Sequence, residues 1–122
     1  MAIYVEVNGD LYPASITGRL HDSDWDNRES KAIKVEMSYA DAVNIFVDDV
    51  KWSIVQDIDE MVEHFNDETG EVTYESVSKQ ESYDNSEYNI AGDIIDHRNG
   101  SVTVKMGKLT AAEMLAMIEE VL

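Results

Sequence analysis

Apolar and polar residues alternate along much of this chain, which is the pattern of strands with one buried face. The first two alternating runs, residues 2–7 and 12–18, flank Asn8-Gly9-Asp10. Asparagine and glycine tolerate the positive φ of a tight turn, so we expect these two runs to form a hairpin. Four further strands are expected from alternation or apolar clustering, at residues 33–37, 52–55, 88–95 and 102–106.

Two stretches with helical spacing of apolar residues each follow a capping box, a hydroxyl at the N-cap with a carboxylate three residues on. Ser38 and Asp41 open the first, which predicts a short helix. Thr110 and Glu113 open the second, an amphipathic C-terminal helix. Its apolar face is formed by Met114, Leu115, Ile118, Val121 and Leu122. We expect an α+β fold: an antiparallel sheet of about six strands, a short helix after the third strand, and the C-terminal helix packed on one face.

The segment 57–87 differs from the rest of the chain in its charge. It holds eleven acidic residues and one lysine, so it carries a net charge of −10 out of a total of −17. Apolar residues flank a turn signal at residues 66–70. We expect a projecting acidic hairpin arm within a single domain, 1–122. A disordered, mobile acidic insertion is the alternative, because the apolar content of this segment is low.

The composition narrows the range of functions. With 122 residues and 43% hydrophobic content, the chain can bury a core of its own. Its 9 basic and 26 acidic residues argue against direct binding of nucleic acid or of anionic membranes, both of which attract cationic surfaces. Without cysteine, disulfides and thiolate metal sites are excluded. The first residues do not resemble a signal peptide, which favours the cytoplasm.

The candidate metal site is weak. Asp22, Asp24 and Asp26 alternate as in calcium-binding loops, but an EF-hand would need Gly and Glu where this chain has Asn27 and Ile33. The favoured interpretation is a turn in which the aspartates accept hydrogen bonds from nearby amides. The three histidines lie far apart and lack zinc-site spacing. We expect no metal and no cofactor.

No catalytic motif is present either. The chain has no GxSxG elbow and no glycine-rich phosphate loop, and its six glycines stand singly. We therefore expect no catalytic residue and no enzymatic activity. Trp25 lies in the polar loop 21–30, and we expect it to be tucked against the edge of the core rather than exposed as a binding anchor.

The acidic segment carries the functional hypothesis. Closely spaced carboxylates on a rigid protein can occupy a cationic groove that binds phosphates. The positive electrostatic potential of that groove attracts the carboxylates. Aromatic residues among the acids would supply apolar anchors. The alternative is a solvated surface that only keeps the protein soluble. The expected partner-binding residues are Asp59, Glu60, Glu63, Asp67, Glu68, Glu71, Tyr74, Glu75, Glu81, Tyr83 and Asp84.

Several short strings resemble a known family. They are YVEVNG (4–9) with YPA (12–14), DWDNRESK (24–31), FVDD (46–49) with WSIV (52–55), and DHRNG (96–100). These look like an uncharacterised family of small acidic proteins from phages and prophages of Gram-positive bacteria. The resemblance covers the core strands and both turns, and 57–87 looks like the part where relatives vary in length. It implies a phage setting, but the family has no assigned active site from which a residue's role could be transferred.

A phage setting sharpens the functional hypotheses. The first is an anti-defence, anti-CRISPR-like inhibitor that acts in the host cytoplasm as a nucleic-acid mimic. Its partner would be a basic host protein, such as a CRISPR nuclease or another nucleic-acid-binding protein. The second is a virion or tail morphogenesis component, whose hairpin docks on a neighbouring subunit. A small-molecule or nucleotide-signal binding protein is a third alternative, and the apolar helix face leaves a homodimer open.

Overall fold

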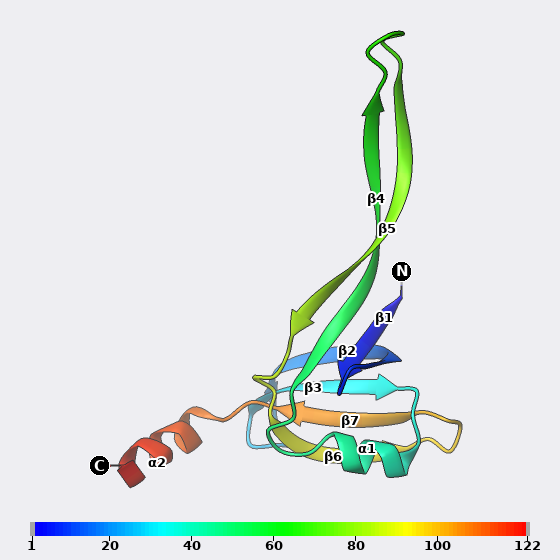
Figure 1. Cartoon of the computed structure of the whole chain (residues 1–122). Helices are drawn as coiled ribbons and strands as arrows, with labels where there is room; N and C mark the ends of the chain where they lie inside the picture. The colour runs from blue at the N-terminus through cyan, green and yellow to red at the C-terminus, as the bar shows by residue number, and fades with distance from the viewer. Residues whose placement is uncertain (1, 122) are drawn as a thin grey trace.

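The structure of the chain is a computed structural model that describes residues 2–121 (Figure 1). Within these residues, seven strands form one antiparallel sheet accompanied by two helices. The elements are β1 (Ile3–Val7), β2 (Asp10–Asp22), β3 (Arg28–Val35), α1 (Tyr39–Ile45), β4 (Trp52–Phe65), β5 (Val72–Asp84), β6 (Ile90–Asp96), β7 (Val102–Gly107) and α2 (Ala111–Val121). Across the sheet the strand order is β5-β4-β1-β2-β3-β7-β6. The predicted α+β class is confirmed in this mostly-sheet form.

The sheet has seven strands instead of about six because the acidic segment belongs to it. β4 runs without a break from Trp52 to Phe65, so it joins the predicted strand 52–55 to the first half of the predicted hairpin. β5 is its antiparallel partner and forms the edge of the sheet. No glycine or proline occurs between residues 52 and 65, so nothing in the backbone chemistry ends the strand early.

The core lies on one face of the sheet, where every second residue of β1 and β7, and of the last part of β3, is apolar. Ile33 and Val104 lie opposite each other on β3 and β7, and both are fully buried. Trp52 covers part of this layer, and its indole Nε1 donates to the carbonyl of Tyr88 (3.1 Å). The same cluster contains Val5, Val7, Val35, Met37, Ala42, Phe46, Val102 and Met106.

Local signals in the sequence placed two features correctly. Asn8 and Gly9 have φ values of 54° and 83°, so the predicted tight turn joins β1 to β2. At the start of α1 the side-chain oxygen of Ser38 accepts from the N–H of Asp41 (3.1 Å), as the capping box predicted.

The C-terminal helix, in contrast, does not pack on a face of the sheet, so that part of the predicted fold is wrong. The side chains of Met114, Leu115 and Ile118 are 48%, 57% and 57% exposed. Figure 1 shows α2 extending away from the sheet beyond the end of β7. The side chain of Val121 and the whole of Leu122, predicted for the same apolar face, lie outside the described residues.

The physical reason is that the apolar side of the sheet is already covered. α1, Trp52 and Tyr88 occupy the surface on which α2 was expected, and the link 108–110 leads the chain past the start of β3. The N–H of Lys108 donates to the carbonyl of Glu29 (2.9 Å), which fixes the direction of this link. Neither helix in the described part of the chain is long and apolar enough to cross a membrane.

Trp25 is tucked against the end of the sheet, as predicted. Its ring packs over the backbone of Gly92 and Gly107, where an added Cβ would come within 2.8 Å of the indole in both cases. The guanidinium carbon of Arg28 lies 4.9 Å from the centre of the same ring. The loop before β3 is thus anchored to β6 and β7 by a half-buried aromatic side chain.

Candidate partner-binding site

The distal part of the β4–β5 hairpin projects beyond the sheet. β4 pairs with β1 only through residues 52–56, whereas its pairing with β5 continues to Phe65 opposite Val72. We call residues 58–79 the arm; it is a two-stranded ribbon that stands out from the body in Figure 1. Its eight paired residues per strand span about 26 Å at a rise of about 3.3 Å per residue. Seven carboxylates and one lysine give the arm a net charge of −6.

A hydrogen-bonded turn closes the arm. The side-chain oxygen of Asn66 accepts from the N–H groups of Glu68 (2.9 Å) and Thr69 (3.3 Å), and the N–H of Gly70 donates to the carbonyl of Asn66 (2.8 Å). Gly70 has a φ of 71°, which a side chain would disfavour. The predicted turn at 66–70 is therefore confirmed. It presents three exposed carboxylates at the tip, those of Asp67, Glu68 and Glu71.

Strand pairing divides the side chains of the arm between two faces, because residues directly opposite each other point the same way. Glu63 lies opposite Tyr74, and Asp59 lies opposite Ser78, whose hydroxyl donates to its Oδ1 (2.8 Å). We call this side the Tyr74 face; it carries Asp59, Met61, Glu63, Phe65, Val72, Tyr74, Ser76 and Ser78. The opposite Lys79 face carries Ile58, Glu60, Val62, His64, Thr73, Glu75, Val77 and Lys79.

On the Lys79 face the carboxylates lie beside Lys79 and His64. Lys79 Nζ lies 3.0 Å from Glu60 Oε2 and 3.6 Å from Glu81 Oε1, and His64 Nε2 lies 2.9 Å from Glu75 Oε2. The hydrogen bond to Glu60 is the main cause that raises the pKa of Lys79. These groups are exposed, so the pairs add little to stability, but the charge of Lys79 offsets part of the negative charge on this face.

On the Tyr74 face and at the tip, carboxylates stand beside exposed apolar side chains. Within residues 2–121, no basic side chain lies within ion-pairing distance of Glu63 or of the three tip carboxylates. Met61, Phe65 and Tyr74 are 64%, 63% and 65% exposed. Large apolar side chains this exposed gain free energy when a partner covers them. The Tyr74 face and the tip are therefore the part of the arm best suited to contact.

The structure places all eleven predicted residues on the hairpin but not on one surface. On the arm strands, they divide between the Tyr74 face (Asp59, Glu63, Tyr74) and the Lys79 face (Glu60, Glu75). The tip holds Asp67, Glu68 and Glu71, and the base of the hairpin holds Glu81, Tyr83 and Asp84.

The three residues at the base are engaged locally. The hydroxyl of Tyr83 donates to Glu81 Oε2 (2.5 Å), which lowers the pKa of Glu81 and raises that of Tyr83. Asp84 Oδ1 accepts from the hydroxyl of Ser86 (2.6 Å), and this bond lowers the pKa of Asp84. Sequence reasoning counted Phe65 among the aromatic anchors but missed Met61 and Val72 as contact candidates. Their alternation with Glu63 along the strands was the signal that could have placed them on one face with Tyr74.

The aspartate loop is a structural cluster. Asp22 is fully buried, and its carboxylate accepts from Lys105 Nζ (2.7 Å), Ser30 Oγ (3.0 Å) and the N–H of Asp24 (3.1 Å). The bond from Lys105 is the main cause that lowers the pKa of Asp22. The carboxylate thus holds the loop to β3 and β7, in agreement with the predicted turn.

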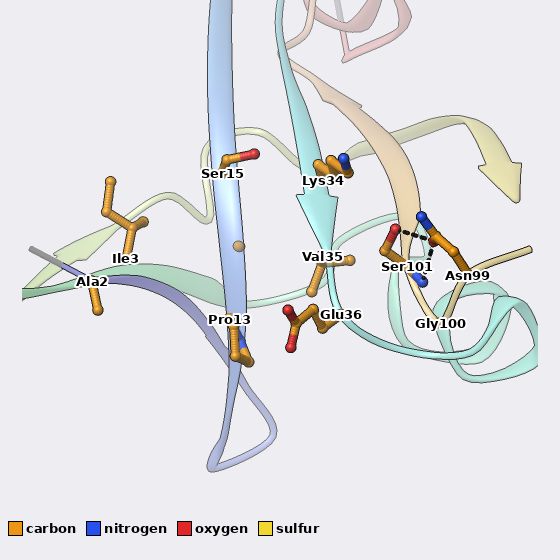
Figure 2. Close-up of a pocket in the computed structure, with 11 residues that line it drawn as sticks. Ala2, Ile3, Pro13, Ser15, Lys34, Val35, Glu36, Asn99, Gly100 and Ser101 are labelled. Atoms are coloured by element: carbon orange, nitrogen blue, oxygen red, sulfur yellow. Dashed lines mark hydrogen bonds between the residues drawn. The ribbon is translucent and has the colours of Figure 1, made fainter. Parts of the chain in front are cut away.

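The largest hollow described is an open one of about 650 Å³ between the starts of β1 and β7 (Figure 2). It is lined by Ala2, Ile3, Pro13, Ala14, Ser15, Lys34, Val35, Glu36, Asn99, Gly100 and Ser101. The hydroxyl of Ser101 donates to Asn99 Oδ1 (2.6 Å), and an amide oxygen cannot serve as its general base. The hollow therefore offers no activated nucleophile at this serine.

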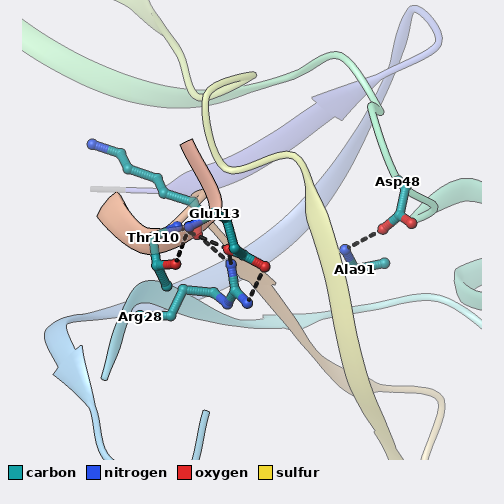
Figure 3. Close-up of polar contacts among 6 residues, drawn as sticks. Arg28, Asp48, Ala91, Thr110 and Glu113 are labelled. Carbon is teal, nitrogen blue, oxygen red and sulfur yellow. Dashed lines mark hydrogen bonds and ion pairs between the residues drawn. The ribbon is translucent and has the colours of Figure 1, made fainter. Parts of the chain in front are cut away.

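α2 is attached to the body through its first turn (Figure 3). Arg28 donates to both carboxylate oxygens of Glu113 (2.6 and 3.2 Å) and to the carbonyl of Lys108 (2.7 Å). Glu113 in turn accepts from the N–H of Thr110 (2.9 Å), which completes the predicted capping box. These bonds, chiefly that from Arg28, lower the pKa of Glu113 to about 2. The start of the helix is thus fixed while its apolar side stays exposed.

Comparison with protein-family models, curated proteins and solved structures finds no match to this chain. Its function is therefore inferred from its own geometry.

Proposed function

We propose that this chain is a non-enzymatic binding protein whose arm docks in a cationic groove of a partner protein. The observation that supports the proposal is the Tyr74 face with the tip, where carboxylates without a basic neighbour stand beside exposed apolar side chains. Charge of this kind steers a partner into place, and burial of apolar side chains then holds it. The arm supplies both within a narrow ribbon of two strands.

The proposed partner is a basic host protein whose groove binds nucleic acid, for example a CRISPR nuclease. On the Tyr74 face Asp59 and Glu63 lie four residues apart, about 13 Å along β4, and the tip adds three more carboxylates, so negative charge extends along the arm. The resemblance to phage proteins supports an anti-defence role in the host cytoplasm. In that role the arm would compete with nucleic acid for the groove and carry out no chemistry.

Charge reversal on the arm tests this proposal. The arm variant carries Glu63→Lys, Glu68→Lys, Glu71→Lys and Glu75→Lys. The matched control carries Glu6→Lys, Asp10→Lys, Glu36→Lys and Asp93→Lys, which reverse the same amount of charge at exposed positions on the body. Purified CRISPR nucleases and proteins captured from host lysate serve as candidate partners, and DNA cleavage and binding are measured over a salt series.

We expect wild type and the body control to bind, with affinity falling as salt rises, and the arm variant to lose at least about tenfold in affinity. Equal loss in both variants would show that only net charge matters. Binding by the arm variant at wild-type strength would reject the arm as the docking element.

The second candidate is a phage virion or tail morphogenesis component. The exposed apolar side of α2 favours it, because assembly subunits bury such surfaces against neighbours. Mass spectrometry of purified particles separates the two candidates: the chain is expected in virions only if it is an assembly component.

A further inference from the structure

The two edges of the sheet differ in how open they are to another strand. β6, at one edge, has seven residues and a break in register between Ala91 and Ile94. β5, at the other edge, has thirteen residues, and its register with β4 is unbroken from Val72 to Asp84. Bulges and short length protect an edge from pairing, whereas a long regular edge strand is a template for it. Of the two edge strands of the sheet, β5 is therefore the one more open to another strand; in the arm, residues 58–65 of β4 likewise pair only with β5 among the described residues.

The hydrogen bonds at both ends of the hairpin show which main-chain groups face outward. The N–H of Asn66 donates to the carbonyl of Glu71 (2.9 Å), and the N–H of Asn85 donates to the carbonyl of Trp52 (2.9 Å). Both pairs place an odd-numbered residue of the second strand against the first, with unbroken register between them. Hydrogen-bonded pairs alternate along an antiparallel ladder, so the odd residues of β5 bond to β4. The N–H and C=O groups of Val72, Tyr74, Ser76 and Ser78 consequently point away from β4.

Two of these even-numbered residues, Val72 and Tyr74, belong to the apolar part of the Tyr74 face. Val72 and Tyr74 are 41% and 65% exposed, so an added strand would find open main-chain groups and apolar side chains together. On the Lys79 face, side chains of such a strand would approach Glu75, which lies beside His64; Lys79 stands four residues further along β5, and the tip carboxylates lie near the opposite end. This arrangement matches an extended segment that alternates apolar with basic residues.

We propose that the partner adds an extended, cationic strand of its own to the outer edge of β5 in the arm. This inference rests on the proposed function, because it names how the docked partner is held. Main-chain bonds to Val72, Tyr74, Ser76 and Ser78 give the affinity. The net charge of −6 on the arm sets the sign of the partner's charge. A second copy of this chain is disfavoured as the occupant, since two arms of like charge would lie side by side.

Proline on the edge strand tests the inference. The edge variant carries Ser76→Pro and Ser78→Pro, which remove two outward N–H groups without removing a bond to β4. Its control carries Ser76→Ala and Ser78→Ala, which remove the same hydroxyls and keep both N–H groups. The probes are an alternating lysine–valine octapeptide and the same peptide N-methylated at alternate residues. Affinity is measured by calorimetry, and oligomeric state by light scattering.

We expect the unmethylated peptide to bind wild type and the alanine control equally, and the proline variant at least about tenfold more weakly. The methylated peptide should also bind at least about tenfold more weakly. Amide hydrogen exchange adds an internal check. In the protein alone the odd amides of β5 and the even amides of β4 in the arm exchange slowly in every variant, and peptide binding protects the even amides of β5.

Three results would overturn the inference. One is equal binding of the methylated and unmethylated peptides. Another is a wild-type protein that forms a dimer and a proline variant that stays monomeric. That result would show that a second copy of this chain is the occupant of the β5 edge. The third is a proline variant that binds the peptide and the captured partner as wild type does, while the charge-reversed arm variant binds neither. That result would reject strand addition but leave the proposed function, docking of the arm through its charge, standing. If neither variant lost binding, the proposed function would fail together with the inference.

Discussion

Single residues matter most in this protein where the backbone of one element touches a rigid side chain of another. Gly107 ends β7 beneath Trp25 and Arg28, and an added Cβ there would lie 2.4 Å from Arg28 Cδ and 2.8 Å from the indole. Trp25 was predicted to lie in a polar loop, and close packing explains why that loop stays on the sheet. Glycine is needed at Gly107 for space, whereas at Gly70 it is needed for φ.

Replacing Gly107 by alanine should therefore destabilise the fold by about 1–3 kcal/mol, because the indole and the Arg28 side chain must move aside. Gly18→Ala is the matched control: its position lies within β2 and nothing stands within 4 Å of the added Cβ. We expect the control to be neutral or slightly stabilising. Urea unfolding of both variants measures the difference, and a similar loss at Gly18 would contradict the packing explanation.

At the scale of elements, the strands of the sheet form the core, whereas the apolar side of α2 stays outside it. β3 and β7 build the core, and Val104 in β7 is fully buried. α2 has an apolar side of similar character, yet it meets the body mainly through Glu113 and Arg28. Amphipathic periodicity indicates that a helix has a side to bury, but it does not state which surface covers that side.

Two aspartate substitutions separate these roles. Val104→Asp should unfold the protein or cost at least about 3 kcal/mol, since it buries an unpaired charge. Ile118→Asp should leave the melting temperature within about 2 °C of wild type, because this side chain is already 57% exposed. Thermal unfolding followed by circular dichroism compares them. A large loss at Ile118 would mean that α2 packs on the body in solution.

At the scale of the whole molecule, charge is distributed unevenly. The arm holds 7 of the 26 acidic residues in 22 of the 122 residues, and it projects where few other groups are near. Like charges across the chain, with a net charge of −17, repel one another and oppose compactness. The arm places part of this charge away from the core, on exposed side chains.

Salt should therefore stabilise the protein by itself even as it weakens partner binding. We expect the melting temperature to rise by about 3 °C or more between low and moderate ionic strength, as screening reduces the repulsion. The charge-reversed arm variant, whose net charge is closer to zero, should melt at the same or a higher temperature and respond less to salt. Differential scanning calorimetry over a salt series tests this, and an equal salt response of both proteins would contradict it.

The sequence by itself determined the features that depend on near neighbours. Alternation predicted the core strands, Asn8-Gly9 and residues 66–70 predicted their turns, and the two capping boxes predicted where the helices begin. The concentration of acids in one segment is also a property of sequence alone. Each of these follows from backbone preferences and hydrogen bonds within a few residues, so no distant contact is needed to specify it.

Only the tertiary structure decided the features that depend on residues far apart in the chain. It joined the fourth strand to the acidic hairpin, set Met61 and Phe65 on one face with Tyr74, and turned alternate main-chain groups of β5 outward. It also left the apolar side of α2 exposed, because other parts of the chain had already covered the sheet. Register and competition for one apolar surface are set by long-range packing, which periodicity in a single segment does not encode.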